Sequence, residues 1–126
     1  MNQASDLARE RYISLATFRR NGTEVKTPVW FAVIDGRLYV VSAGNAGKVK
    51  RLRHSPKARV AVSDARGGVR GTWRDATARI VTDRGVIERA HKALRAKYGW
   101  QARVLDLFSR LAGRIRHRAW IEVALR

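Results

Sequence analysis

The feature of this sequence that most constrains its fold is a series of short extended runs separated by tight-turn signals. Residues 13–18 alternate large apolar side chains with small or polar ones, which is the pattern of a β-strand. The pairs Asn21-Gly22 and Asp35-Gly36 favour hairpin turns, because these residue types tolerate a positive φ. Two further extended runs, 25–34 and 38–41, flank the second turn. We therefore expect three antiparallel strands in the first third of the chain.

Three more strands are expected in the rest of the chain. Residues 59–63 form a short run, and residues 72–82 form a longer one with Ala76, Ala78 and Ile80 on one face. Residues 119–125 complete the set. We therefore predict a mainly β fold with peripheral helices (α+β), in which six antiparallel strands form a barrel with helices on its outside or at its end.

Helical patterns occupy two stretches of the first half of the chain. Residues 6–12 are interpreted as a short helical lead-in to the first strand. A second helix is expected from about Gly47, and it should stop before Pro56 because the residue preceding a proline disfavours helical geometry.

The periodicity becomes helical again between the fifth and sixth strands. Residues 83–99 carry apolar side chains at helical spacing, with Asp83 placed as the N-cap and Gly99 as the C-cap. A further amphipathic stretch, 104–111, is closed by Gly113. We expect two helices here.

Composition limits the class of protein. The 126 residues are 45% apolar, which suits one globular domain spanning 1–126. No apolar run approaches the roughly 20 residues that a membrane span requires, and no secretory signal is visible, so a cytoplasmic location is expected by default. The absence of cysteine excludes disulfides, thiol nucleophiles and thiolate metal sites.

The net charge of +17 indicates an anionic partner or a solvated basic surface. The cations are spread along the whole chain and form no basic block of the kind found in a nucleic-acid-binding tail. A nucleic-acid-binding module is kept as an alternative, and it is disfavoured because paired exposed aromatics interleaved with the cations are missing.

One basic stretch, 42–53, has the outline of a phosphate site. A small-residue segment that includes Ser42 leads into a helix whose first turn carries Lys48, Lys50 and Arg51. Gly47 lets the backbone approach a ligand closely, and cations in a first helical turn gain nothing from the helix dipole. A bound anion explains their presence there, and the alternative is a solvated basic face.

The sequence contains no self-contained catalytic cluster. The three histidines are dispersed, no Gly-x-Ser-x-Gly nucleophile motif occurs, and the few acidic residues lie on expected turns or exposed faces. If the protein is an enzyme, we expect a bound cofactor to carry the reactive atom while the chain binds and orients it.

Several segments together resemble the pyridoxamine-phosphate-oxidase-like split β-barrel family. They follow one another in the order and spacing of that family, and they cover the chain from about residue 13 to 123. The closest resemblance is to its members that use the deazaflavin coenzyme F420. The segments are Leu15-Ala16-Thr17-Phe18, Thr27-Pro28-Val29-Trp30-Phe31, Leu38-Tyr39-Val40, Gly47 to Arg53 and Pro56 to Val60.

The resemblance implies a split barrel of the flavin-reductase/FMN-binding type and a homodimer with cofactor grooves at its interface. It also implies which residues bind the cofactor. The segment Gly47, Lys48, Val49, Lys50 and Arg51 would hold the phosphate and acidic tail, the strand Pro28, Val29 and Trp30 would lie along the ring, and Ser42 and Ser63 would face the groove. Ala46 replaces a Ser or Thr that many relatives carry, so one phosphate contact is missing.

The function that follows as an expectation is hydride transfer from reduced F420 to a small unsaturated or conjugated organic acceptor. A packing role for Trp30 stays open beside its role at the ring. The same family resemblance also covers proteins that use FMN or haem, and both remain alternatives.

Overall fold

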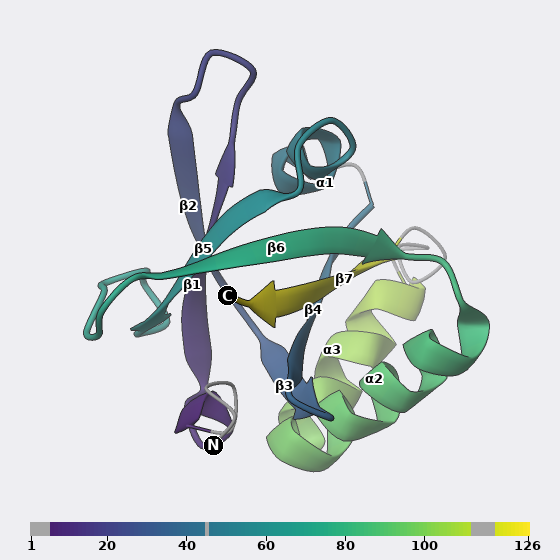
Figure 1. Cartoon of the computed structure of the whole chain (residues 1–126). Coiled ribbons are helices and arrows are strands. Elements are labelled where there is room, and N and C mark those ends of the chain that lie inside the picture. The colour runs from purple at the N-terminus through teal and green to yellow at the C-terminus, as the bar shows by residue number, and fades with distance from the viewer. Residues whose placement is uncertain (1–5, 45, 112–117) are drawn as a thin grey trace.

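The computed structural model describes residues 6–44, 46–111 and 118–126, and it shows one curled antiparallel sheet with three helices beside it (Figure 1). The elements in chain order are β1 (Tyr12–Phe18), β2 (Glu24–Val29), β3 (Phe31–Ile34), β4 (Arg37–Ala43), α1 (Gly47–Leu52), β5 (Lys57–Ser63), β6 (Arg74–Val81), α2 (Arg84–Tyr98), α3 (Trp100–Leu111) and β7 (Arg118–Leu125). The mainly β prediction with peripheral helices is confirmed.

The sheet has seven strands where six were expected, because the run 25–34 is two strands. Their order across the sheet is β2-β1-β5-β6-β7-β4-β3, so β2 and β3 lie at opposite edges although only Trp30 separates them in the chain. Val29 pairs with Ile13 of β1, whereas Phe31 pairs with Val40 of β4. The chain therefore changes its pairing partner at Trp30 and joins the two edges of the curled sheet.

Tyr98, at the end of α2, fixes this change of partner. Its hydroxyl oxygen accepts a hydrogen bond from the Phe31 backbone N–H at 3.1 Å and lies 2.7 Å from the Arg11 carbonyl oxygen. Its ring stacks on Trp30 with the centroids 4.2 Å apart and the planes 5° apart. The buried N–H that follows the break is thus satisfied by a side chain from a distant helix.

The concave face of the sheet holds the main apolar core. Alternate residues of each strand point into it, as the twofold periodicity of strands requires. α1 covers one end of this core with Val49 and Leu52, so its exposed residues face away from the barrel. The largest fully buried members are Phe31, Ile13, Leu15, Leu38, Ile121, Val40, Val49, Val60 and Val123.

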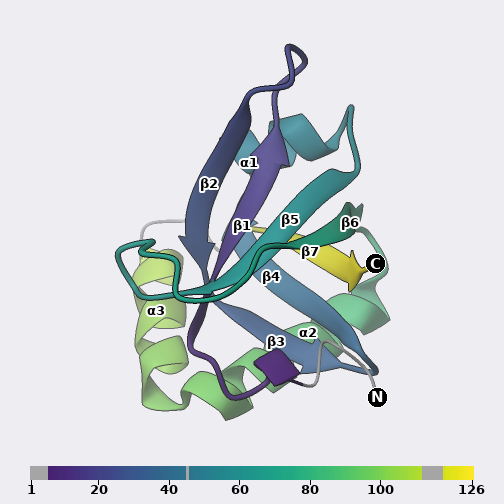
Figure 2. The ribbon, with the colours of Figure 1, turned by 60° about the vertical axis from the view of Figure 1, so that its left-hand side comes forward.

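A second apolar cluster joins the convex face to the helices. Ala90, Leu94 and Tyr98 of α2 pack against Ala32 and Tyr39 of the β3 and β4 hairpin. α2 and α3 lie together at one end of the molecule, and α1 lies at the other end in both ribbon views (Figure 1, Figure 2). The convex face is therefore covered by helices on one side only.

The turns and caps follow the sequence closely. Asp35 and Gly36 both have positive φ, 50° and 78°, as the expected hairpin requires. At the first hairpin only Gly22 is positive, while the Asn21 side chain accepts the Thr23 N–H at 3.0 Å. The Asp83 carboxylate accepts the Val86 N–H, so its N-cap role is confirmed.

Several boundaries differ from the expectations, including the start of β5 at Lys57 where the run was expected from 59. Residues 6–12 are no helix, because only 6–7 form a short 3-10 turn and Tyr12 already pairs in β1. Ser42 belongs to β4, which is paired with β7 as far as Ala43. β6 begins at 74, not 72, and α3 begins at Trp100, directly after the Gly99 cap, not at 104. The predicted stop at Gly113 lies outside the described residues.

Within the described ranges, no helix has the length and apolarity needed to cross a bilayer. The described histidines and acidic residues form no group of three that could hold a metal ion.

Candidate cofactor site

The α1 region carries positive charge without nearby negative charge in the sequence. No Asp or Glu occurs from residue 36 to 63, and this stretch holds seven Lys and Arg residues: Arg37, Lys48, Lys50, Arg51, Arg53, Lys57 and Arg59. Four of the seven lie between 48 and 53, in or directly after α1. The expected basic stretch is thus a single short helix at one end of the barrel.

The Arg51 side chain folds back over the start of α1. A Cβ atom placed on Gly47 would lie 2.7 Å from Arg51 Nη1, so a larger residue there would force the guanidinium to shift. Arg51 Nε donates a hydrogen bond of 2.6 Å to the hydroxyl oxygen of Thr17, a fully buried residue of β1. Because Nε is engaged, the guanidinium is held in one orientation with its terminal N–H groups available for a ligand.

Lys48, Arg51 and Arg19 form a group that we call the Arg51 cluster. Burial first, and then the neighbouring charge of Arg51, lowers the pKa of Lys48. Burial first, and then the charge of Arg19, lowers the pKa of Arg51. In the described part of the chain none of these three side chains forms an ion pair with a carboxylate. Burial and, after it, the neighbouring like charges both disfavour the charged forms of Lys48 and Arg51, and a bound anion would offset that cost.

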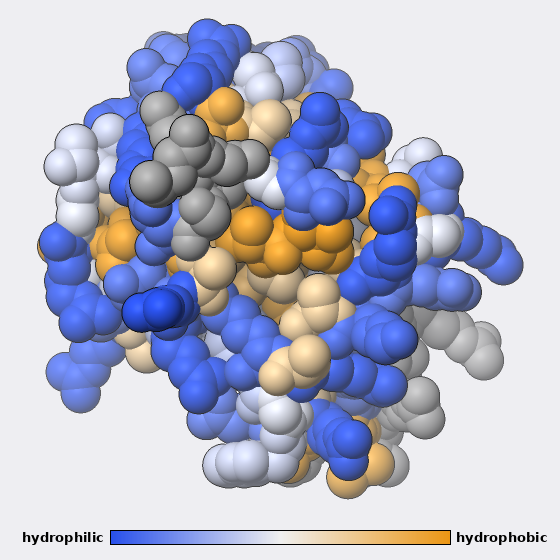
Figure 3. All heavy atoms as spheres, turned by 60° about the horizontal axis from the view of Figure 1, so that its bottom comes forward, coloured by the Kyte–Doolittle hydropathy of each residue, from blue (hydrophilic) through white to orange (hydrophobic). Residues whose placement is uncertain are grey.

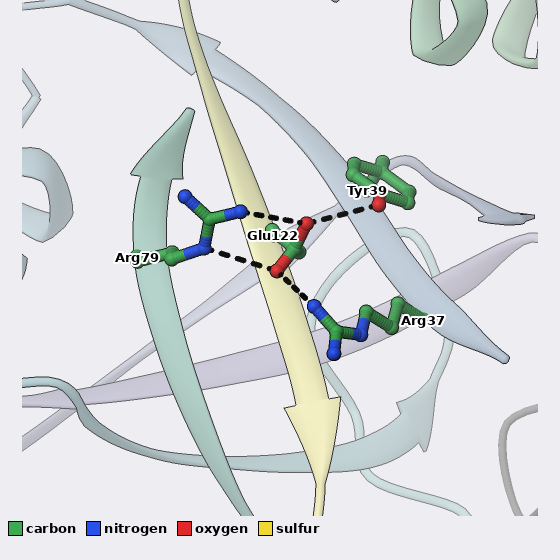
Figure 4. Close-up of polar contacts among 4 residues, drawn as sticks. All are labelled: Arg37, Tyr39, Arg79 and Glu122. Atoms are coloured by element: carbon green, nitrogen blue, oxygen red, sulfur yellow. Dashed lines mark hydrogen bonds and ion pairs between the residues drawn. The ribbon is translucent and has the colours of Figure 1, made fainter. Parts of the chain in front are cut away.

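Other cations in the molecule are neutralised, which makes the contrast informative. Glu122 on β7 receives Arg37 at 2.8 Å and Arg79 at 3.0 Å, and the Tyr39 hydroxyl donates to it at 3.0 Å (Figure 4). Asp106 on α3 in the same way binds three basic side chains, Arg95, Arg118 and His91. These two buried carboxylates are structural hubs, whereas the Arg51 cluster has no such partner among the described residues.

The predicted α1 residues share one element but differ in what they offer. Lys48 is half-buried beside Arg51, and Lys50 is exposed. Val49 is buried in the core, so its side chain anchors the helix and cannot face a ligand. Ala46 precedes the helix without a side-chain cap, as its sequence requires.

Pro28, Val29 and Ser63 gather at the opposite end of β1, whereas Ser42 lies apart from them on β4. Pro28 pairs with Ser14, and Ser63 pairs with Tyr12, so both lie near the start of that strand. Thr17, which binds Arg51, lies three residues further along than Ser14, a span of about 10 Å at about 3.3 Å per residue. The two groups of predicted residues are thus brought to one strand but not into contact.

The side chains at that end are occupied by local contacts. The Ser63 hydroxyl is buried and donates to the Asp64 carbonyl oxygen at 3.2 Å. On β4, the Ser42 hydroxyl likewise donates to the Ala43 carbonyl oxygen at 3.2 Å. One face of the Trp30 ring is covered by Tyr98. Packing is therefore part of the role of Trp30, and only its other face could meet a ligand ring.

A half-buried lysine, Lys97, lies against the rings of Phe31 and Tyr98, and the sequence did not indicate it. Lys97 Nζ is 3.5 Å from the centroid of the Phe31 ring and donates to the Phe31 carbonyl oxygen at 3.1 Å. Burial, followed by the charge of Arg11, lowers the pKa of Lys97 to about 8.

Thr17 and Arg19 were also missed by sequence reasoning. A signal for Thr17 existed, because it is a hydroxyl residue on the strand face whose other members, Ile13 and Leu15, are apolar. The signal for Arg19 did not exist, since its place beside Arg51 depends on the first hairpin. A separate hollow lined by Asp6, Arg74, Asp75 and Arg126 contains none of the predicted residues.

Comparisons with known proteins agree with this fold. The family model described as pyridoxamine 5'-phosphate oxidase matches residues 2–126. No curated protein matches the chain. The structure is similar to that of a conserved hypothetical protein from Mycobacterium tuberculosis, with a TM-score of 0.73 and 22% identity, over 100% of this chain and 81% of that one.

Two other similar structures are those of a haem storage protein and an FAD-binding protein. The haem storage protein HutZ from Vibrio cholerae gives a TM-score of 0.72 at 13% identity, over 97% of this chain and 87% of that one. An FAD-binding protein from Mesorhizobium loti gives 0.63 at 18% identity, over 95% of this chain and 82% of that one. At these identities the likeness shows a shared fold.

Proposed function

This chain belongs to the pyridoxamine 5'-phosphate oxidase family, and on that premise we propose that it is an oxidoreductase that binds the deazaflavin coenzyme F420. Its reaction would be hydride transfer to a small unsaturated or conjugated organic acceptor. The observation that carries the proposal is the Arg51 cluster, three cations that lack a carboxylate partner among the described residues. F420 carries a phosphodiester and several glutamate carboxylates, so its tail is an extended polyanion that such a cluster would attract.

The residues of α1 would divide the binding of that tail. Arg51, held by Thr17, would present its terminal N–H groups to the phosphate, and Lys48 beside it would add a second cation. Lys50 is exposed on the same helix and would contact carboxylates further along the tail. Charge-assisted contacts of this kind contribute about 1.5–3 kcal/mol each where they are partly desolvated.

The ring end would lie toward Pro28, Val29 and Trp30, near the start of β1, about 10 Å along that strand from Thr17, which holds Arg51. Val29 is buried and would act through its backbone, while Trp30 is backed by Tyr98 and cannot move freely. A rigid wall of this kind suits a reaction that depends on holding two reactants in contact. When bound, F420 supplies the hydride, so the chain needs no acid and base pair of its own.

The function also requires a homodimer, with a second copy completing the groove. In the single chain Pro28 is exposed on β2, the strand at one edge of the sheet. A partner subunit would exclude water from the ring end, which hydride transfer needs.

Titration with F420, followed by its visible absorbance or fluorescence, tests the proposal. We expect Lys48→Ala and Lys50→Ala each to raise the dissociation constant about tenfold, which corresponds to about 1.4 kcal/mol. Lys92→Ala is the matched control, because Lys92 is an exposed lysine on α2 and its loss removes the same charge. No binding at tens of micromolar, or equal affinity in Lys48→Ala and Lys92→Ala, would refute the assignment.

FMN and haem are the second candidates, favoured by the FAD-binding and haem storage proteins that share the fold. FMN has a phosphate but no acidic tail, so it would use Lys48 and Arg51 and leave Lys50 unused. Lys50→Ala should therefore weaken F420 and leave FMN affinity unchanged. Of the described histidines that could bind haem, His91 is already in contact with Asp106 at 3.1 Å, and His54 is exposed just after α1. The absorption spectrum of the purified protein separates these chromophores.

A further inference from the structure

Helix α3 turns an apolar stripe toward solvent. Trp100 is 72% exposed, Val104 40% and Leu107 57%, and all three are large apolar residues. Their spacing, i, i+4 and i+7, places them on one side of the helix. Leu105, which is 42% exposed, lies about 100° around the helix from Val104 and so outside the stripe.

The side of α3 that packs on the protein is the small and polar one. Among the described side chains of α3, which run from 100 to 107, Ala102 and Asp106 are the buried ones. At about 100° per residue, Val104 lies roughly 160° from both Ala102 and Asp106 around the helix. The usual arrangement is therefore reversed, because the stripe that would be expected to face the core points directly away from it.

Contacts of Asp106 hold α3 in this orientation. Its carboxylate accepts a hydrogen bond from Arg95 Nε of α2 at 2.9 Å and from Arg118 of β7 at 2.6 Å, and it lies 3.1 Å from His91 Nε2. If α3 rotated about its axis to bury Trp100 and Leu107, these bonds would break. The Asp106 carboxylate would then lose the basic partners that compensate its burial. The stripe is thus a fixed surface of this chain.

The charge of the chain decides which kind of partner fits this stripe. Asp106 is the one acidic residue of α3, and it is buried and neutralised, while Arg103 is exposed on the same helix. The α3 helix of a second copy would bring exposed Arg103 to this stripe and no free carboxylate to pair with it. A bilayer surface with anionic headgroups offers both negative charge and an apolar interior, and tryptophan favours that boundary.

We propose that α3 is a membrane-surface contact, in which Trp100, Val104 and Leu107 enter the headgroup region of an anionic bilayer and Arg103 contacts its phosphates. This surface lies at the end of the molecule opposite α1, so binding there leaves the Arg51 cluster open (Figure 1, Figure 2). Figure 3 views the molecule from the lower end of Figure 1, where apolar side chains reach the surface among hydrophilic ones. The proposal does not depend on the identity of the cofactor.

Vesicle co-sedimentation tests it with phosphatidylcholine alone and with phosphatidylcholine mixed with phosphatidylglycerol. The variant is the double substitution Trp100→Gln and Leu107→Gln, which keeps the net charge of +17. Val69→Gln is the matched control, because Val69 is 41% exposed on a loop far from α3 in the sequence. Both changes are on the surface, and circular dichroism confirms that the variants fold.

The parent and Val69→Gln are expected to bind mixed vesicles equally at physiological salt. The double variant should bind at least tenfold more weakly, and phosphatidylcholine alone should bind all three poorly. Trp100→Phe should keep the binding and lose most of the vesicle-induced change in tryptophan emission. Equal binding by the double variant and the parent would overturn the proposal, since charge alone then explains the attraction. A double variant that changes from dimer to monomer with unchanged vesicle binding would also overturn it and assign the stripe to a second copy.

Discussion

The hydrogen bond between Thr17 and Arg51 joins the barrel core to the cationic group at α1. Thr17 is fully buried and has a single hydroxyl, which accepts from Arg51 Nε at 2.6 Å. Arg51 in turn lies over Gly47, where a larger residue would force it to shift. At the scale of single residues, one hydroxyl therefore sets the direction of the cation that we assign to phosphate binding.

Thr17→Val tests this link, because valine keeps the shape of threonine and removes the hydroxyl. We expect F420 affinity to fall about tenfold, which corresponds to about 1.4 kcal/mol. Thr17→Ser restores the hydroxyl and should recover most of the affinity. Isothermal titration calorimetry measures both.

Thr27→Val is the control for this prediction. The Thr27 hydroxyl oxygen is buried without a hydrogen-bond partner in the described structure, so its loss should leave affinity unchanged and stability equal or slightly higher. Equal F420 affinity in Thr17→Val and Thr27→Val would show that the hydrogen bond from Arg51 to Thr17 does not contribute to F420 binding.

At the scale of elements, two buried carboxylates fasten separate pieces of the fold. Asp106 ties α3 to α2 and β7, and Glu122 ties β7 to β4 and β6. Burial alone would raise the pKa of each, but hydrogen bonds outweigh it: those from Arg118, Arg95 and His91 lower the pKa of Asp106, and those from Arg79, Tyr39 and Arg37 lower that of Glu122. Both groups are therefore more acidic in the folded chain than in the unfolded one.

The sign of the resulting pH dependence follows from those lowered values. A carboxylate with a depressed pKa contributes stability above its unfolded pKa, and this stability is lost as the pH falls through the folded pKa. We expect the free energy of unfolding in urea to drop steeply below about pH 4, where unfolded carboxylates titrate. The decline should be shallower in Asp106→Asn and in Glu122→Gln.

At neutral pH, Asp106→Asn should cost about 3 kcal/mol, because it leaves Arg118 largely buried without its carboxylate. Glu88→Gln is the control, since Glu88 is exposed on α2 and should change neither the stability nor its slope with pH. An identical acid profile for Asp106→Asn and Glu88→Gln would show that Asp106 does not act as a fastening point.

At the scale of the whole molecule, we predict a homodimer. The ring end of the proposed groove includes Pro28, which is exposed on the edge strand β2, so we expect a second copy to enclose a cofactor there. Light scattering should give about twice the chain mass of 14.3 kDa, at a salt concentration high enough to screen the +17 charge on each copy. A strict monomer under those conditions would contradict the prediction.

Much of the fold could be predicted from the sequence because its signals are local. The turn at Asp35 and Gly36 needs positive φ at two adjacent residues, and the Asp83 cap needs one oxygen three residues before an N–H. Strand periodicity likewise depends on neighbours within a few residues. The barrel class, the α2 boundaries and the basic character of α1 were therefore readable in the chain itself.

What the tertiary structure decided are the features that depend on residues far apart in the sequence. The run 25–34 reads as one strand, but its two halves pair with β1 and β4, and Tyr98 from α2 satisfies the Phe31 N–H at the break. Thr17 and Arg51 are 34 residues apart, so their bond leaves no periodic trace. The amphipathic pattern of α3 showed a stripe but not its direction, because the direction is set by the contacts of Asp106 with α2 and β7. Local chemistry determined which elements form, and long-range pairing determined where each one turns its side chains.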